Sequence, residues 1–354
     1  MSLPTRELGL NGPRVTSLGF GAMSLSVAYG LVGSDEERFK LLDRVYELGE
    51  KFWDTSDIYG DNERLIGKWF RRGGSDGDDE GDPDRQGKRR DDIFLATKFG
   101  FWFDNRQQVG GVRSDPEHVK VACAKSLRRM KTDYIDLYYC HRVDGTTPIE
   151  KTIEAMVELK EEGKIRYLGL CEVSAETLRR AHAVHPITAL QIEYSPLFLD
   201  IENEQIGLLK TCRELGVAVV AYAPLGRGML TGRYRSRDDL EDGDWRKLIS
   251  PRFAEGNFES NLMFADQIGE LAEEKGCTAA QLVLAWLMAQ GEDIFPIPGT
   301  KNITYAEENL GALELTLTEE EIQAVRDIAE NVEVAGDRYD QGMLSTLLTD
   351  TPSL

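Results

Sequence analysis

The feature of the sequence that most constrains its fold is an eightfold alternation of short apolar segments with longer amphipathic segments. The short segments are rich in β-branched and aromatic residues, and the longer ones carry apolar residues at helical spacing, so strands and helices alternate. Strands that are apolar almost throughout indicate a parallel sheet covered by helices. The strands are expected within residues 14–23, 51–60, 92–100, 134–142, 165–174, 187–195, 217–228 and 293–300.

Eight strand–helix units in series predict a (β/α)8 TIM barrel, a fold of the α/β class. The alternative is a doubly wound open sheet with a second domain. A dinucleotide-binding sheet of that type carries GxGxxG after its first strand, and the nearest match here, GFGAMS at 19–24, has the wrong spacing. No break in composition separates two domains, so we expect one barrel domain over residues 1–354.

Several segments lie outside the eight units. TRELGLNG at 5–12 predicts an N-terminal hairpin with the start of the first strand, and TEEEIQAVRDIAENV at 318–332 predicts an extra C-terminal helix. Residues 335–354 form a C-terminal tail without a strong pattern. Residues 73–92 are rich in glycine and aspartate and almost free of apolar residues, which predicts an acidic, flexible insert between two core elements.

Local signals mark several helix ends. Asp115-Pro116 predicts the start of a helix, because proline is favoured at the first helical position. Ser174, followed by Thr177, predicts another start, and Asn62 is a fair N-cap for a third helix. Gly216 predicts a helix end, since glycine readily adopts the left-handed conformation found there.

Composition excludes several classes of function. The formal net charge of −20 opposes a nucleic-acid surface, so no nucleic-acid partner is expected. No apolar run is long enough to cross a membrane, and the N-terminus lacks the pattern of a secretory signal. The five cysteines are scattered and odd in number, which favours free thiols and a cytoplasmic location, without a metal site.

Four polar residues stand at the predicted ends of neighbouring strands, where barrel enzymes carry their chemistry. They are Asp54 and Tyr59 in KFWDTSDIYG, Lys98 in ATKFG and His141 in YYCHR. Each has an ordinary structural interpretation when it is taken alone. Together they match the needs of hydride delivery to a carbonyl group, in which the developing alkoxide must receive a proton.

Each of the four residues has a chemical role in such a reaction. Tyr59 can donate the proton, and an adjacent Lys98 ammonium would lower its pKa, which is about 10 in water. Asp54 would keep a buried Lys98 charged. An N–H of His141 would hold and polarise the carbonyl oxygen.

With these residues in place, the sequence resembles the aldo-keto reductase superfamily over roughly residues 5–332. The resemblance rests on FWDTSDIYG, ATKFG, DYIDLYYCHR, GKIRYLGLCEVS, QIEYSP, VVAYAPLGRG and PIPGTKNITYAEEN, which occur in the family's order. It implies a (β/α)8 barrel and NADPH-dependent reduction of aldehydes or ketones without metal. The family's Asp, Tyr, Lys and His tetrad corresponds to Asp54, Tyr59, Lys98 and His141.

The resemblance also implies a set of NADPH-binding residues. Tyr222 would stack on the nicotinamide ring, Gln191 would bind its carboxamide, and the loop with Arg227 would receive the pyrophosphate. Two positions depart from the common pattern: Cys171-Glu172 replaces a frequent Ser-Asn pair, and Tyr305 stands where many members have arginine. The full cofactor set is Cys171, Glu172, Gln191, Tyr222, Leu225, Gly226, Arg227, Gly228, Thr300, Lys301, Glu308 and Asn309.

Within that set, Thr300 and Lys301 would contact the 2′-phosphate, whereas Glu308 and Asn309 would face the adenine. A substrate pocket is expected around the first loop at 22–30 and after the third and fourth strands. Its predicted residues are Met23, Tyr29, Phe99, Trp102 and Arg142, together with Phe101. These aromatic side chains favour apolar or aromatic aldehydes, and residues 229–260 are expected to cross the cofactor as a lid.

Two functions of different classes remain open from the sequence. The first is an NADP-dependent oxidoreductase that reduces small-molecule aldehydes or ketones to alcohols. The alternative is a regulatory subunit that binds NADPH as a redox sensor and has little turnover, as the potassium-channel β subunits of this superfamily do. A non-redox barrel enzyme is disfavoured because paired carboxylates or metal ligands are not found at several strand ends. The oligomeric state is not indicated.

Overall fold

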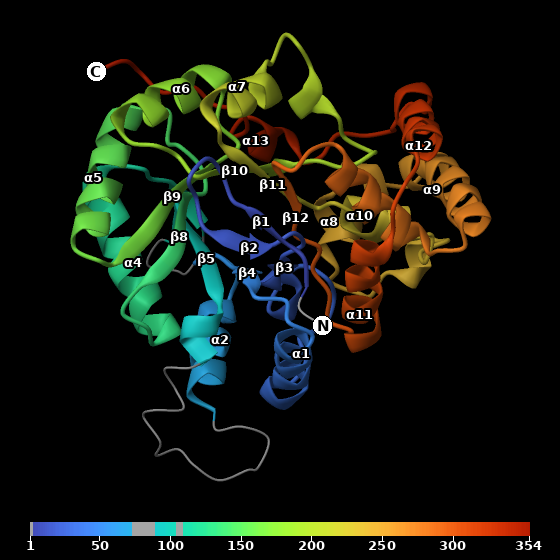
Figure 1. Ribbon diagram of the computed structural model, residues 1–354, viewed down its shortest axis with the longest axis horizontal. Helices are drawn as coiled ribbons and strands as arrows, with labels where there is room; N and C mark the ends of the chain where they lie inside the picture. Colours follow the sequence, from blue (N-terminus) through green and yellow to red (C-terminus); the bar gives the residue numbers. More distant parts are fainter. Residues whose placement is uncertain (1–2, 73–88, 104–108) are drawn as a thin grey trace.

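The computed structural model describes residues 3–72, 89–103 and 109–354 (Figure 1). Most of the predicted acidic insert at 73–92 therefore lies outside the described residues. Its last four residues, 89–92, form a helical turn. Within that turn Arg90 is buried and pairs with Asp136 at 2.8 Å, so this end of the predicted insert belongs to the packed structure.

Eight parallel strands form one sheet in chain order. They are β3 (Phe20–Gly21), β4 (Phe52–Asp54), β5 (Phe94–Phe99), β8 (Ile135–Cys140), β9 (Ile165–Cys171), β10 (Ala189–Glu193), β11 (Ala218–Tyr222) and β12 (Ile294–Pro296). The backbone nitrogens of Gly19 and Gly21 donate to the carbonyls of Pro296 and Pro298 at 2.9 and 3.1 Å. These bonds join the first strand to the last, and the predicted (β/α)8 barrel is confirmed.

The junction between β3 and β12 depends on glycine. A Cβ atom at Gly21 would lie 2.7 Å from the carbonyl oxygen of Ile297, and one at Gly299 would lie 2.4 Å from the carbonyl oxygen of Gly21. Contacts this short do not occur between a real Cβ and backbone oxygen. Any larger side chain at these positions would separate the two strands and open the barrel.

Helices surround the barrel (Figure 1). Those after the strands are α1 (Asp35–Glu47), α2 (Asn62–Arg71), α4 (Pro116–Met130), α5 (Ile149–Glu161), α6 (Ala175–Val184), α7 (Leu208–Leu215), α10 (Ala279–Ala289) and α11 (Ile303–Gly311). The others are α8 (Trp245–Ile249), α9 (Asn257–Lys275), the predicted extra helix α12 (Glu319–Asn331) and α13 (Gln341–Leu344). The caps at Asp115, Ser174 and Gly216 form as expected.

The segment 14–23 is divided between two structures rather than forming one strand. Its start is β2 (Arg14–Thr16), which pairs with β1 (Thr5–Glu7) as the expected N-terminal hairpin, and only β3 belongs to the barrel. Leu8 and Val15 of the hairpin are buried in the same apolar cluster as Phe52 and Val220 of the barrel interior. The hairpin therefore covers one end of the barrel (Figure 1).

A second hairpin follows β5 and was not predicted. It consists of β6 (Phe101–Phe103) and β7 (Val109–Val112), which pair antiparallel. The indole ring of Trp102 packs over the backbone of Gly110, where a Cβ atom would lie 2.6 Å from the ring. The Gly-Gly pair at 110–111 could have indicated this hairpin, since glycine in a strand often marks a close approach of another group.

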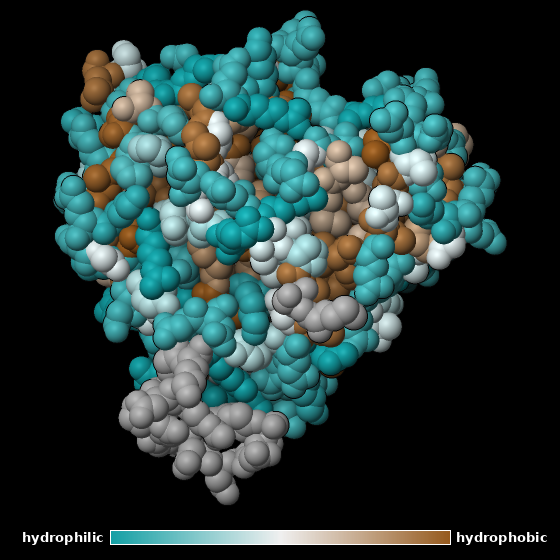
Figure 2. All heavy atoms as spheres, viewed as in Figure 1, coloured by the Kyte–Doolittle hydropathy of each residue, from teal (hydrophilic) through white to brown (hydrophobic). Residues whose placement is uncertain are grey.

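The face seen in Figure 2 is mostly hydrophilic, with apolar side chains in scattered spots, as the high content of charged residues leads one to expect. Among the described residues, no helix is both long and apolar enough to cross a membrane.

Candidate active site

The centre of the candidate site is a buried ion pair between two neighbouring strands. Lys98 on β5 and Asp54 on β4 form an ion pair, and both side chains are essentially inaccessible to solvent. The Lys98 ammonium also donates to the carbonyl of Thr55 at 2.8 Å, and Gln191 on β10 donates to the other oxygen of Asp54 at 2.8 Å. Burial opposes the charge on Lys98, but Asp54 and Tyr59 outweigh it and raise the lysine pKa.

Tyr59 lies in the loop between β4 and α2, with its hydroxyl 3.4 Å from Lys98 Nζ. Burial raises the pKa of this tyrosine to about 12, and the Lys98 charge acts in the opposite direction. The phenol therefore holds its proton at neutral pH. The nearby ammonium would stabilise the phenolate if that proton were transferred.

His141 directly follows β8, and its ring stands beside Tyr59. The ring centroids of Tyr59 and His141 are 6.1 Å apart with an interplanar angle of 86°, and the ring of Phe101 packs against His141 at 5.2 Å. The Ser56 hydroxyl lies 3.2 Å from His141 Nδ1. Burial, followed by the charges of Arg142 and Lys98, holds the pKa of His141 well below its usual range. The imidazole is therefore neutral.

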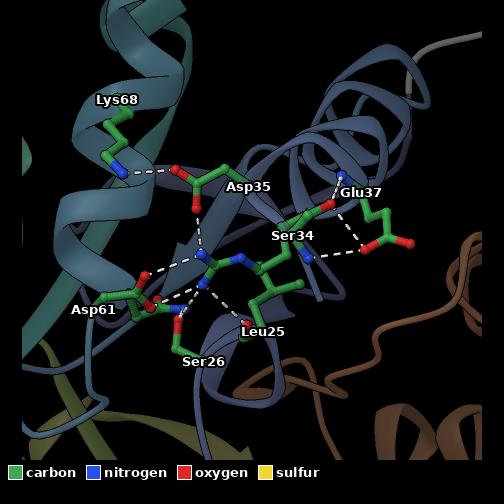
Figure 3. Close-up of polar contacts among 9 residues, drawn as sticks. Leu25, Ser26, Ser34, Asp35, Glu37, Asp61 and Lys68 are labelled. Atoms are coloured by element: carbon green, nitrogen blue, oxygen red, sulfur yellow. Dashed lines mark hydrogen bonds and ion pairs between the residues drawn. The ribbon is translucent and has the colours of Figure 1, made fainter. Parts of the chain in front are cut away.

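A second network, centred on the buried Arg38 side chain, holds the loop that carries Tyr59 (Figure 3). Arg38 on α1 donates to both carboxylate oxygens of Asp61 at 2.8 and 3.0 Å, and also to the Leu25 carbonyl and the Ser26 hydroxyl at 3.3 Å each. Asp35, which is held by Lys68, accepts from the same guanidinium. The network ties the first loop of the barrel to the residues that follow Tyr59.

Asn62 contributes to the same connection. Its side-chain amide donates to the carbonyl of Ala22 at 2.9 Å and accepts from the Thr55 hydroxyl at 2.6 Å. The helix N-cap expected at Asn62 is instead Asp61, and Asn62 is the first helical residue. The structure thus uses Asn62 to fix the loop around Tyr59 rather than to cap α2.

The barrel and this arrangement of Asp54, Tyr59, Lys98 and His141 can be compared with known proteins. The sequence model of the Aldo/keto reductase family matches residues 17–330. The chain belongs to the aldo/keto reductase family. It is 51% identical over 359 residues to "Aldo-keto reductase str7" of Strobilurus tenacellus, covering 100% of this chain and 99% of that one. It is 45% identical over 356 residues to "Aldo-keto reductase yakc [NADP(+)]" of Schizosaccharomyces pombe, with the same coverage.

Solved structures agree with this assignment. The aldo-keto reductase AKR11C1 from Bacillus halodurans, in its holo form, superposes with a TM-score of 0.72 at 28% identity, covering 96% of this chain and 99% of that one. The glycerol dehydrogenase AKR11B4 from Gluconobacter oxydans, at 23% identity and a TM-score of 0.75, has the same fold; it covers 95% of this chain and 98% of that one.

The residues expected to bind an aldo-keto reductase cofactor lie at the ends of the later strands. Tyr222 at the end of β11 donates its hydroxyl proton to Glu172 at 2.8 Å. Glu172 is itself buried and accepts two bonds from Arg338 at 3.0 and 3.1 Å. The preceding residue, Cys171, packs in the barrel interior. Glu172 therefore binds protein groups and holds Tyr222 in place, instead of facing an open site.

The loop from Leu225 to Gly228 combines flexible backbone with one cation. Gly226, Arg227 and Gly228 all have positive φ angles, of 57°, 57° and 92°, which glycine adopts without strain. The Arg227 guanidinium lies 3.8 Å from Glu193, 3.3 Å from the Ser250 hydroxyl and 4.3 Å from the ring centre of Tyr339. This cation is held loosely, by one long ion pair.

The last strand–helix connection carries the expected adenosine-side residues. Lys301 donates to the backbone carbonyls of Tyr29 and Leu31, Thr300 lies at the start of the loop, and Asn309 is buried in α11. Glu308 pairs with Arg233, whose guanidinium lies 3.5 Å above the ring of Tyr305. Sequence reasoning missed Arg233, which supplies a cation beside Tyr305.

The predicted substrate residues are only partly brought together. Phe99 is fully buried and packs against Tyr138 and His118, on the helix-facing side of β5 and away from His141. Phe101, rather than Phe99, packs against His141, and Trp102 follows it in the β6–β7 hairpin. Met23 lies in the short helix η1 (Ala22–Leu25), and the ring of Tyr29 faces Arg246 at 5.0 Å. Arg142 is buried beside His141.

The tail at 335–354 contributes to the site, which its sequence did not indicate. Arg338 is buried against Glu172 and Glu193, and the hydroxyl of Tyr339 lies 3.4 Å from that of Tyr222. A lone Arg-Tyr pair in an otherwise irregular segment is too weak a signal to find by pattern alone.

Proposed function

We propose that this aldo-keto reductase uses NADPH to reduce aldehydes or ketones to alcohols, with Tyr59 as the proton donor. The observation that carries the proposal is the placement of the Tyr59 hydroxyl 3.4 Å from the Lys98 ammonium, which is itself paired with buried Asp54 and stands beside a neutral His141. The relative from Schizosaccharomyces pombe, whose name includes NADP(+), supports the choice of cofactor.

The donor set at the mouth of the barrel fits a dinucleotide that carries a 2′-phosphate. Arg227 would bind the pyrophosphate, Lys301 and Arg233 would bind the 2′-phosphate, and Tyr222 would support the nicotinamide. These three cations suit anionic groups. When bound, the reduced nicotinamide supplies the hydride.

The remaining steps belong to side chains of this chain. In the tautomer that accepts a hydrogen bond from the Ser56 hydroxyl at Nδ1, the single N–H of the neutral imidazole is on Nε2. This N–H would hold the carbonyl oxygen of the substrate. The Tyr59 hydroxyl would then give its proton to the same oxygen as negative charge develops there. Lys98 would stabilise the resulting phenolate until solvent returns a proton.

A direct test is the loss of NADPH absorbance at 340 nm with purified protein and a panel of aldehydes, ketones, quinones and pyridoxal. Rapid loss that requires Tyr59 would establish a carbonyl reductase, and the order of the rates would indicate the substrate class. Tight NADPH binding without turnover on any substrate would instead support a redox-sensing regulatory subunit.

Replacing Lys301 or Arg233 with alanine should weaken binding of NADPH by about tenfold to a hundredfold, with little effect on NADH. Each variant removes one charge-assisted contact to the 2′-phosphate, and such contacts contribute about 1.5–3 kcal/mol. Titration of both cofactors, followed by protein fluorescence, gives the two dissociation constants. Lys40→Ala, on the exposed face of α1, is the matched control. If a variant lost the same affinity for NADPH and for NADH, the substituted residue would not contact the 2′-phosphate.

A further inference from the structure

Arg142 is a buried cation whose positive charge is not matched by a neighbouring carboxylate. Its side chain is 4% exposed. Its only hydrogen bond is to the carbonyl of His141 at 2.6 Å, and its Nε has no partner. Within residues 3–72, 89–103 and 109–354, no carboxylate lies within 4.0 Å of this guanidinium. Burial of an unpaired charge is costly, so such groups are rare unless a ligand completes them.

The other buried arginines near it are paired. Arg338 binds Glu172, and Arg252 binds Glu193 at 2.9 Å. Arg227 shares Glu193 at 3.8 Å. Asp200 is exposed, and its carboxylate lies near Arg338 and Arg252. Arg142 is the one guanidinium group of these four that has no carboxylate within 4.0 Å among the described residues.

The position of Arg142 places its charge at the reacting end of the site. It follows His141 in the chain, and His141 faces Tyr59. The Glu172 carboxylate acts on the Arg142 guanidinium, and the side chains of Tyr222, Tyr339 and Cys171 belong to the same surroundings, at the ends of β9 and β11 and in the C-terminal tail. Arg142 thus faces the mouth of the barrel, between His141 and Tyr222.

We propose that Arg142 binds a carboxylate group of the carbonyl substrate. The inference rests on the proposed function, and it narrows the substrates to aldehydes or ketones that carry a carboxylate a few bonds from the carbonyl carbon. A carboxylate carries one negative charge, which would pair with the buried Arg142 guanidinium. Its planar pair of oxygens also matches a guanidinium group, which binds such pairs through two parallel hydrogen bonds.

The substrate for this test is 4-formylbenzoate, compared with its methyl ester. Both compounds have an electron-withdrawing group opposite the aldehyde, so their carbonyl groups have similar reactivity, and they differ mainly in charge. The aromatic ring suits the side chains of Phe101 and Trp102 near His141. The measured quantity is the ratio of kcat/KM for the acid to kcat/KM for the ester, with NADPH held at saturation.

Wild-type protein should prefer the acid by about tenfold or more, the effect of one charge-assisted pair. Arg142→Met should remove that preference by lowering kcat/KM for the acid, mainly through KM, and should leave the ester within about threefold. Arg142→Lys should retain part of the preference. Arg14→Met, which removes an exposed arginine of the N-terminal hairpin, is the matched control and should retain all of it.

Two results would overturn the proposal: no preference for the acid in wild-type protein, or an equal loss on both substrates in Arg142→Met. A separate measurement covers the case in which neither aldehyde is reduced, which would contradict the proposed reductase function itself. Terephthalate should quench the fluorescence of the NADP⁺ complex and should lose affinity about tenfold in Arg142→Met. Unchanged terephthalate binding in that variant would also reject the role of Arg142.

The stability of the variant distinguishes a ligand-binding role from a structural one. Because Arg142 lacks a carboxylate partner among the described residues, Arg142→Met should unfold at the same temperature as wild type or higher. A lower unfolding temperature, together with loss of both substrates, would mean that Arg142 holds the fold rather than the substrate.

Discussion

Replacement of Tyr59 with phenylalanine should lower kcat for carbonyl reduction by at least about a hundredfold, the lower end of the range for a lost general acid. The ring would remain beside His141, so the pocket keeps its shape, and only the hydroxyl that gives its proton to the developing alkoxide is removed. The rate is measured by NADPH absorbance at 340 nm. The dissociation constant for NADPH, measured by fluorescence, should be nearly unchanged.

The matched control is Tyr134→Phe. Tyr134 precedes β8 at the opposite end of the barrel, where its hydroxyl bonds to Asp91 at 3.0 Å. This variant removes a tyrosine hydroxyl that lies far from the candidate active site, so it should retain full activity. If Tyr59→Phe kept most of its rate, another group would be the acid, and the assignment of Tyr59 would be wrong.

Replacement of Lys98 with methionine should abolish activity and also destabilise the protein. The substitution leaves Asp54 buried without its cation, and breaking a buried pair costs about 3–5 kcal/mol. Asp54 can avoid this cost by binding a proton. Burial already raises its pKa, and loss of Lys98 would raise that pKa further. The destabilisation should therefore be full at high pH and should shrink as the pH falls towards the pKa of an unfolded aspartate.

The double variant Lys98→Met with Asp54→Asn separates the two effects. It removes both charges, so it should recover most of the free energy of unfolding at pH 7 while remaining inactive. Chemical denaturation at pH 5 and pH 8 gives the stabilities. If Lys98→Met alone lost the same free energy of unfolding at both pH values, the Asp54 carboxylate would not be the source of the destabilisation.

The barrel was predictable because its strands and helices follow local patterns of hydrophobicity. The proximity of the four candidate residues was also predictable, since parallel strands bring their carboxyl ends together, and Asp54, Lys98 and His141 stand at three such ends. Helix caps at Asp115, Ser174 and Gly216 followed from the preferences of single residues. All of these depend on interactions that are short in sequence or are imposed by the repeating fold.

Other features depend on contacts between distant residues, which local patterns do not encode. Glu172 was expected to bind cofactor because of its position after β9, but its partner Arg338 lies in a segment without a recognisable pattern. Phe99 and Phe101 differ by two positions, yet a turn at Gly100 sends them to opposite sides. Arg233 reaches Tyr305 only through the fold of the long connection after β11. Sequence alone could not select among these partners.

The ion pair of Glu172 and Arg338 joins residues that are 166 positions apart. Contacts of such separation form late in folding, because a long loop must close before they contribute. The strand pairs that are consecutive in the sheet and closer in the chain can therefore form while Glu172 still lacks its partner. The support for Tyr222 is completed only when the tail docks. A newly folded chain should therefore acquire its secondary structure before Tyr222 gains this support, so completion of this part of the candidate site should be a separate, later event.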